Sequence, residues 1–240
     1  MNMARQIEVT ILIFSKNRPF QCENLLKSLE PHLWDQQDNH SHNVHVIFTC
    51  DEENDDDYSD IEGQFPFANF IKEEDARLRQ NGQSEFNGFQ AALFEALPLE
   101  EGQNTNNKTD QQEFVLFLVD DMIIFDTFCL WEAAEHLGRD SSAFSFHSKL
   151  HPGISYCHTK GEACPAPGGF TGVGRPTAGG EGPPGALLTV ALLRFGRAAA
   201  ELEWAYAWDL AGGLYRRADV ARVVRKILLD HEEEEEGGGG

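Results

Sequence analysis

The first third of the chain alternates a short apolar run with a segment in which leucine recurs at helical spacing. The clearest run is Ile7 to Phe14 (IEVTILIF), which is β-branched and nearly continuous, the pattern of a strand buried on both faces. A polar turn follows from Ser15, and Pro19 suits the first turn of a helix. The leucines of LLKSL then predict that this helix packs one face inward.

The same alternation continues through most of the sequence. Apolar runs predict further strands at 44–49, 114–119 and 143–146, and helical spacing predicts helices at 72–80, 85–97, 126–137, 186–203 and 218–229. Polar segments at 35–43 and 100–112 are expected to be a loop and a linker. Strands alternating with helices favour an α/β fold, a three-layer α/β/α sandwich around a mostly parallel sheet.

The composition is compatible with one globular domain. The 240 residues are 41% hydrophobic, enough to bury a core. We expect a single domain over 5–229, interrupted by a flexible Gly/Pro-rich insert at 165–185 and followed by a disordered acidic and glycine tail at 230–240.

Charge excludes one class of partner. The formal net charge is -21, so nucleic-acid backbones and anionic membrane surfaces are repelled. Most of the excess lies in two runs, 51–62 and 232–236, and such runs are usually solvated loops or tails. The five cysteines form no CxxC, which favours reduced thiols over a disulfide framework or a zinc site.

Location is judged from the same composition. No apolar stretch reaches the roughly 18 residues of a membrane span, and the N-terminal segment lacks the flanks and cleavage site of a signal peptide. We therefore expect no integral membrane segment and a cytoplasmic protein.

Charged residues follow three of the predicted strands. Lys16 and Arg18 come after the first, Asp51 after the second, and Asp120-Asp121 after the strand at 114–119. Because ligands of parallel sheets bind at the carboxyl ends of the strands, we expect these side chains to converge on one edge.

The adjacent carboxylates Asp120 and Asp121 can bind a divalent metal that carries a diphosphate, since hard cations prefer oxygen ligands. Alternatively, Asp121 caps a turn and Asp120 is solvated. Asp51 can accept hydrogen bonds from a base or ribose, or can be an ordinary loop acid. Lys16 and Arg18 can hold a phosphate, or be plain turn residues.

Two further groups of residues leave alternatives open. Trp204, Trp208 and Asp209 can form a sugar-packing face beside a general base, or the two tryptophans can be core aromatics at helical spacing. Any of His147, His151 and His158 can supply a further metal ligand, although such histidines are more often surface or packed residues.

Several of these segments resemble one family. VTILIFSKNRP with LLKSL is similar to the opening of family-2-like glycosyltransferases of the GT-A fold, a Rossmann-like α/β/α sandwich. The segment from Asn81-Gly82 to Ala92 resembles the helix before their metal strand, and FVLFLVDDMIIF resembles their strand that ends in a DXD-type motif. SFHSKLHPGISYCHT and EWAYAWDLAGGLYRRADV resemble a poorly characterised subgroup of these enzymes.

The resemblance implies an activity and residue roles. The chain would be a hexosyl- or related transferase that moves a sugar from a nucleotide-diphosphate sugar to a glycan or small-molecule acceptor, with Mn²⁺ or Mg²⁺ and with inversion. Ser15, Lys16 and Arg18 would form the nucleotide-contacting turn, and Asp51 would contact the nucleoside. Three further roles are implied: Asp120 beside the diphosphate, Asp121 on the metal, and Asp209 as the catalytic base.

Two departures from the family pattern keep other functions open. The motif reads Asp-Asp-Met rather than Asp-x-Asp, and the 165–185 insert is unusual. A non-catalytic GT-A-like protein that binds a nucleotide or glycan is therefore the main alternative. An acidic calcium-binding or interaction protein that uses 51–62 ranks below it, because the EF-hand spacing is lacking.

Overall fold

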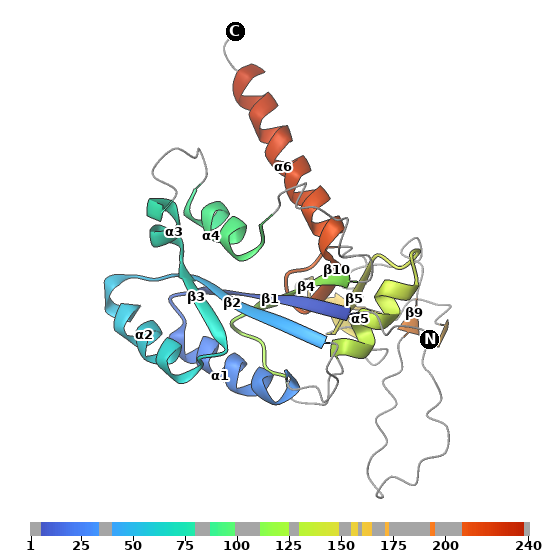
Figure 1. Ribbon diagram of the computed structural model, residues 1–240, viewed down its shortest axis with the longest axis horizontal. Coiled ribbons are helices and arrows are strands. Elements are labelled where there is room, and N and C mark those ends of the chain that lie inside the picture. The colour runs from blue at the N-terminus through green and yellow to red at the C-terminus, as the bar shows by residue number, and fades with distance from the viewer. Residues whose placement is uncertain are drawn as a thin grey trace, which may run out of the picture.

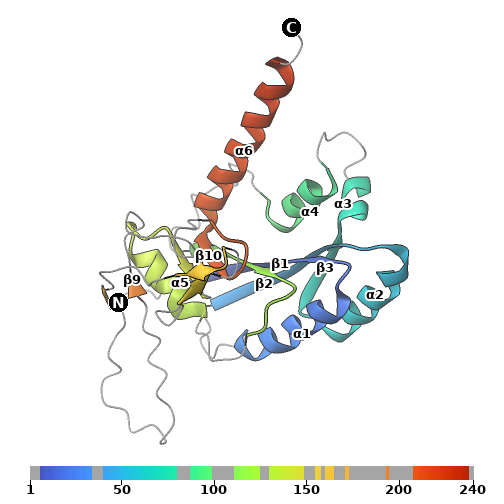
Figure 2. The same ribbon diagram turned by 180° about the vertical axis from the view of Figure 1, so that it is seen from behind.

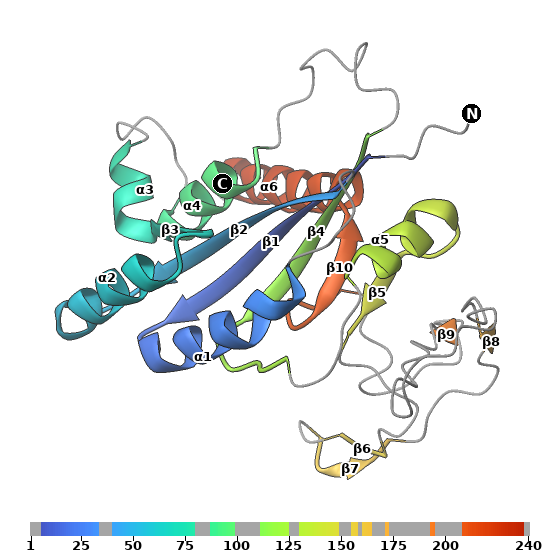
Figure 3. The same ribbon diagram turned by 60° about the horizontal axis from the view of Figure 1, so that its bottom comes forward.

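The computed structural model describes residues 6–33, 40–79, 87–98, 111–124, 130–148, 155–157, 160–164, 171–172, 193–194 and 208–237. Its centre is a six-stranded sheet in the order β3-β2-β1-β4-β10-β5, seen side by side in Figure 3. The strands β3, β2, β1 and β4 are mutually parallel, whereas β10 is antiparallel to both β4 and β5. The predicted α/β class with a mostly parallel sheet is confirmed.

The strands of the main sheet are β1 (Gln6–Lys16), β2 (His40–Thr49), β3 (Ala68–Lys72), β4 (Gln111–Val119), β5 (Ser145–His147) and β10 (Gly213–Arg216). The α-helices are α1 (Pro19–Leu29), α2 (Asp55–Gln64), α3 (Glu73–Arg79), α4 (Gly88–Ala96), α5 (Leu130–Arg139) and α6 (Arg217–Gly237). Two 3-10 turns are η1 (Glu30–His32) and η2 (Glu52–Asn54), and two small hairpins pair β6 (Tyr156–Cys157) with β7 (Glu162–Ala163) and β8 (Thr171–Gly172) with β9 (Leu193–Arg194).

Helices cover both faces of the sheet, as Figures 1 and 2 show from opposite sides. One core joins alternate residues of β1, such as Ile11 and Ile13, to α1, α2 and α5. The other joins Leu12 of β1 and Phe117 of β4 to α3, α4 and α6. Since successive side chains of a strand point to opposite faces, the continuous apolar runs of β1 and β4 supply both cores.

The acidic run at 51–62 is not the solvated loop that its charge predicts. It forms η2 and then α2, in which Tyr58 and Ile61 are buried against the sheet. Three acids in the first turn of α2, at 55–57, stand near its positive dipole end, and Asp55 pairs with Lys72 of β3 at 2.6 Å. An amphipathic face with dipole-matched acids therefore makes a helix of this segment.

Other boundaries also differ from those expected. Strand β2 begins at His40, within the predicted loop 35–43, because it pairs with β1 over its whole length. Strand β3 was not predicted, and β9 lies within the predicted helix 186–203. Helix α6 continues to Gly237 and includes most of the tail expected to be disordered, since glutamate is a good helix former.

Several predictions fall outside the described residues. These are the start of the predicted helix 126–137, nearly all of the linker 100–112, and most of the insert 165–185. The division into one domain over 5–229 stays a prediction.

Candidate functional site at the carboxyl edge of the sheet

The turn after β1 joins the ends of two neighbouring strands. Asn17 has φ 53°, a left-handed conformation that asparagine tolerates better than most residues. Its backbone N–H donates to the Thr49 carbonyl at the end of β2 at 3.1 Å. Its side-chain amide donates to Asp51 Oδ2 at 2.8 Å and accepts from the Asp51 N–H at 2.7 Å. Asp51 is therefore fixed against the β1 turn.

The first carboxylate after β4 is buried and bound on both oxygens. Asp120 has only 5% of its surface exposed. Its Oδ2 accepts from the Ser15 hydroxyl at 2.9 Å and from the Lys16 N–H at 3.3 Å, and its Oδ1 lies 3.4 Å from Nη1 of Arg18. A buried charge needs such partners, so the side chain serves to hold the β1 turn against β4.

Helix α2 contributes one more member to this network. The Tyr58 hydroxyl lies 2.6 Å from Ser15 Oγ and accepts from the Arg18 N–H at 3.1 Å. Because the Ser15 proton goes to Asp120, the Tyr58 proton goes to Ser15, which gives a directed series from the Arg18 N–H through Tyr58 and Ser15 to Asp120. We call these four groups the buried hydrogen-bond chain. Burial raises the pKa of Tyr58, so the phenol keeps the proton it donates.

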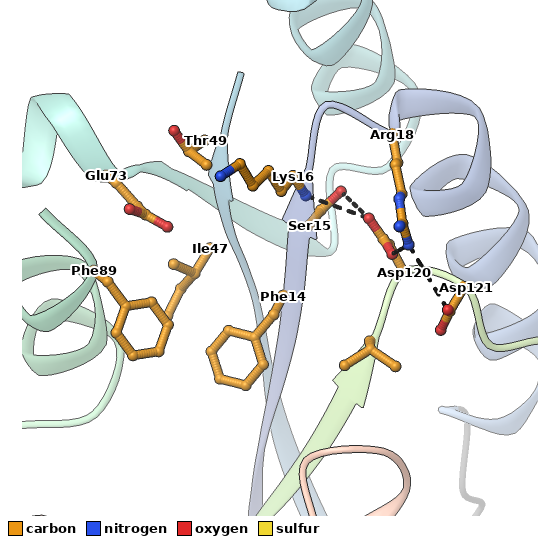
Figure 4. A pocket seen from close by; sticks show the side chains of 11 residues that line it. Phe14, Ser15, Lys16, Arg18, Ile47, Thr49, Glu73, Phe89, Asp120 and Asp121 are labelled. Carbon is orange, nitrogen blue, oxygen red and sulfur yellow. Dashed lines mark hydrogen bonds and ion pairs between the residues drawn. The ribbon is translucent and has the colours of Figure 1, made fainter. Parts of the chain in front are cut away.

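The second carboxylate faces solvent. Asp121 has 62% of its side chain exposed, and its Oδ2 lies 3.7 Å from Nη1 of Arg18. The Arg18 side chain is itself 52% exposed and reaches both carboxylates (Figure 4). One guanidinium therefore contacts both members of an acidic pair, of which Asp120 is fixed and Asp121 is accessible.

A cleft of about 430 Å³ opens at this edge. It is lined by the ends of β1, β2 and β4 and by α3 and α4, through Phe14, Ser15, Lys16, Arg18, Ile47, Thr49, Glu73, Phe89, Val119, Asp120 and Asp121 (Figure 4). Arg18, Asp120 and Asp121 line the β4 side, Phe89 and Glu73 line the side of α3 and α4, and the Lys16 side chain extends toward Glu73 (Figure 4). This division suits a ligand with a charged part and a flat apolar part.

The apolar half was not predicted as part of the site. Phe14 of β1 and Phe89 of α4 have ring centroids 5.5 Å apart. Gly88 lets α4 approach, since a Cβ there would lie 2.9 Å from the Glu73 carbonyl oxygen. Burial raises the pKa of the Glu73 carboxyl, and the nearby Lys16 ammonium acts in the opposite direction. The sequence signal for Phe89 was its place on a predicted helix, which does not distinguish a cleft from a core.

The predicted base lies at the same edge but outside the cleft lining. Asp209 belongs to the turn before β10, where its Oδ1 accepts from the Ala211 N–H at 2.9 Å and its backbone bonds the Tyr215 hydroxyl. Trp208 packs on Tyr215 at 4.6 Å and on Phe117 at 5.6 Å between ring centroids. These contacts favour the core interpretation of Trp208.

The structure thus brings Ser15, Lys16, Arg18, Asp120 and Asp121 together in one cleft, as the strand order predicted. Asp51 adjoins this group through Asn17, and Asp209 stands apart from the lining. What each of these residues binds stays a prediction.

The acidic pair can be tested against the metal that the sequence suggested. Within the described part of the chain, no three His, Cys, Asp or Glu side chains gather as a complete protein-only metal site. Mg²⁺, however, usually takes one or two carboxylates and completes its shell with water and substrate phosphates. Exposed Asp121 offers such oxygens at the wall of the cleft, so the donor set fits. His147 lies on β5 and bonds Ser145 at 2.8 Å, whereas His151 and His158 are outside the described residues.

Comparison with known proteins gives a sequence match over most of the chain. The chain is 27% identical over 228 residues to the bifunctional glycosyltransferase pgtA of Dictyostelium discoideum, covering 92% of this chain and 25% of that protein. The resemblance to glycosyltransferases seen in the sequence is confirmed, although the chain spans only about a quarter of this relative's length. No protein-family model matches the chain.

Solved structures give more distant likenesses. Glucosyl-3-phosphoglycerate synthase from Mycobacterium tuberculosis, in its complexes with UDP and with phosphoglyceric acid, aligns with 50% of this chain and 35% of its own. The identity is 18% and the TM-score 0.30.

No helix in the described parts of the chain has the length and apolar character needed to cross a membrane.

Proposed function

We propose that this chain is a glycosyltransferase that moves a sugar from a nucleotide-diphosphate sugar to an acceptor hydroxyl, with a divalent metal and inversion at the anomeric carbon. The observation that carries the proposal is the cleft at the carboxyl edge. There, a basic turn and an acidic pair from separate strands face an aromatic wall. The similarity to a bifunctional glycosyltransferase supports the same reading.

The charged half of the cleft is assigned to the diphosphate. Asp121 would hold Mn²⁺ or Mg²⁺, which neutralises charge on a departing diphosphate. Arg18 and Lys16 supply cationic donors for the phosphate oxygens. Ser15 and Asp120 position the turn through the buried hydrogen-bond chain, so the donor groups are held in place before the ligand arrives.

The nucleoside and the acceptor are assigned to flanking groups. The contacting pair Phe14 and Phe89 gives the cleft an aromatic surface on which a planar base can pack. Asp51, fixed by Asn17 beside the β1 turn, is assigned to accept from a ribose or base. Asp209 is the proposed general base that takes the proton of the acceptor hydroxyl as it attacks. The Ala211 N–H in the neighbouring turn donates to its Oδ1 and holds the carboxylate in place.

The experiment is donor turnover. The full chain with Mn²⁺ is incubated with UDP- and GDP-sugars, and released nucleotide and transferred sugar are measured by mass spectrometry. We expect turnover with one donor class, a loss of at least about a hundredfold in Asp209→Asn, and a comparable loss in Asp121→Asn. Turnover unchanged by both substitutions would contradict the assignment.

A second candidate is a GT-A-like protein that binds a nucleotide or glycan without turnover. The place of Asp209 outside the cleft lining favours it. Saturable donor binding without hydrolysis or transfer, in the presence of Mn²⁺ and varied acceptors, would select this candidate over the enzyme.

A further inference from the structure

Arg18 occupies the acidic pair in the structure. Its Nη1 lies 3.4 Å from Asp120 Oδ1 and 3.7 Å from Asp121 Oδ2. Asp121 is also the carboxylate that the proposed function assigns to the metal. A guanidinium and a divalent cation repel each other at such separations, so they compete for Asp121.

The two carboxylates differ in how easily they can release Arg18. Both oxygens of Asp120 are engaged inside the protein, and the Ser15 and Lys16 donors stay with it. Asp121 is exposed and has no comparable internal anchor among the described hydrogen bonds. Only the Asp121 half of the arginine contact can therefore be exchanged without breaking buried structure.

The backbone of Arg18 is fixed, whereas its guanidinium group can move. Its backbone N–H is held by Tyr58, its carbonyl accepts from the Cys22 N–H at 3.0 Å, and Pro19 follows it directly. The guanidinium end, in contrast, belongs to a half-exposed side chain at the cleft wall. A planar guanidinium binds phosphate oxygens in pairs, which makes a diphosphate in the cleft an alternative partner.

We propose that Arg18 holds Asp121 while the cleft is empty and transfers to the donor diphosphate when a divalent cation takes its place on Asp121. This rests on the proposed function and adds a mechanism of coupling to it. Metal without diphosphate must displace Arg18, whereas metal with diphosphate gives Arg18 a new partner. Arg18 therefore contributes a positive, reciprocal coupling between metal and nucleotide, in addition to the direct attraction between the cation and the diphosphate.

The test measures binding rather than turnover. Mn²⁺ affinity of the full chain without nucleotide is measured by electron paramagnetic resonance of free Mn²⁺, and UDP and GDP affinity at saturating Mn²⁺ by calorimetry. In Arg18→Gln we expect Mn²⁺ alone to bind about fivefold or more tighter, and the nucleotide about tenfold or more weaker, within the usual range of coupling between sites.

A charge-matched control separates exchange from a general field effect. Lys16→Gln removes the same charge from the same cleft and should change the affinity for Mn²⁺ alone much less. Equal tightening in both variants would overturn the proposal, as would unchanged Mn²⁺ affinity in Arg18→Gln. Thermal unfolding of each variant checks that it is folded. Arg18→Lys keeps the charge but lacks the paired donors of the guanidinium, so it should still compete with Mn²⁺ but bind the nucleotide more weakly.

The outcomes also distinguish the two proposals. If the wild-type chain binds Mn²⁺ and a nucleotide, and Asp121→Asn loses the metal, but Arg18→Gln leaves metal affinity unaltered, the exchange is wrong and the donor site stands. If the wild-type chain binds neither ligand, both the exchange and the proposed function are wrong.

Discussion

Replacing Ser15 with alanine removes the hydroxyl at the centre of the buried hydrogen-bond chain. Ser15 has only 6% of its surface exposed. Its hydroxyl lies 2.6 Å from the Tyr58 hydroxyl and donates to Asp120 Oδ2 at 2.9 Å. Asp120 would lose this donor and keep the Lys16 N–H and the Arg18 guanidinium as partners. The substitution therefore tests whether the carboxyl edge is organised before any ligand binds.

The magnitude follows from the two bonds that are lost. A neutral hydrogen bond contributes about 1 kcal/mol, and one to a charged group about 1.5–3 kcal/mol. Ser15→Ala should therefore lower the free energy of unfolding by roughly 2–4 kcal/mol. For a domain of this size that corresponds to a fall in Tm of roughly 5–15 °C.

The assay is denaturant and thermal unfolding followed by circular dichroism. The control is Ser59→Ala on α2, whose hydroxyl donates to the Asp55 carbonyl on the exposed surface and should be worth less than about 0.5 kcal/mol. In Ser15→Ala/Tyr58→Phe, the two losses should be non-additive by at least about 0.5 kcal/mol. A Ser15 variant no less stable than the Ser59 control would refute the reasoning.

Three further predictions concern other parts of the chain. Gly213→Ala would place a Cβ 2.5 Å from the Asp209 carbonyl oxygen, so it should lower both Tm and any turnover; unchanged values for both would contradict this. The pKa of Asp55 is lowered by the hydrogen bond from Lys72, so Asp55→Asn should be less stable than wild type at neutral pH, with the difference vanishing as pH falls through the lowered pKa; a difference that grows in acid would contradict the sign. Burial raises the pKa of Cys22 to about 12, so peptide mapping should find it alkylated by iodoacetamide only after denaturation.

The strands that position the site could be predicted from sequence because they are buried on both faces. The apolar runs of β1 and β4 have few competing interpretations, and a strand of this kind in an alternating pattern belongs to a parallel sheet. The carboxyl ends of parallel strands meet at one edge whatever the details of packing. The meeting of Lys16, Arg18 and Asp120 therefore followed from topology alone.

The elements that were missed owe their structure to tertiary contacts. Helix α2 has eight acids in or beside it, and this charge led to the prediction of a solvated loop. The two residues that pack on the sheet are Tyr58 and Ile61. Strand β3 is only five residues long, and it is stabilised by its pairing with β2. Neither signal is visible in a local window.

The same limit applies to the site. Tyr58, Glu73 and Phe89 reach the carboxyl edge from helices of both outer layers, and no spacing in the sequence relates them to Asp120. Asp209 illustrates the converse, since a suggestive aromatic-acidic segment became a turn packed beside the cleft rather than a part of its lining.

The most direct test of the central claim is nucleotide binding at this edge, followed as a thermal shift. UDP and GDP are titrated with Mn²⁺ into the wild-type chain and into Asp121→Asn. We predict that one nucleotide stabilises the wild type by about 2.7 kcal/mol at a hundredfold excess over its Kd, with the effect largely lost in the variant. The absence of a shift with either nucleotide, or an equal shift in both proteins, would contradict a metal-diphosphate site between β1 and β4.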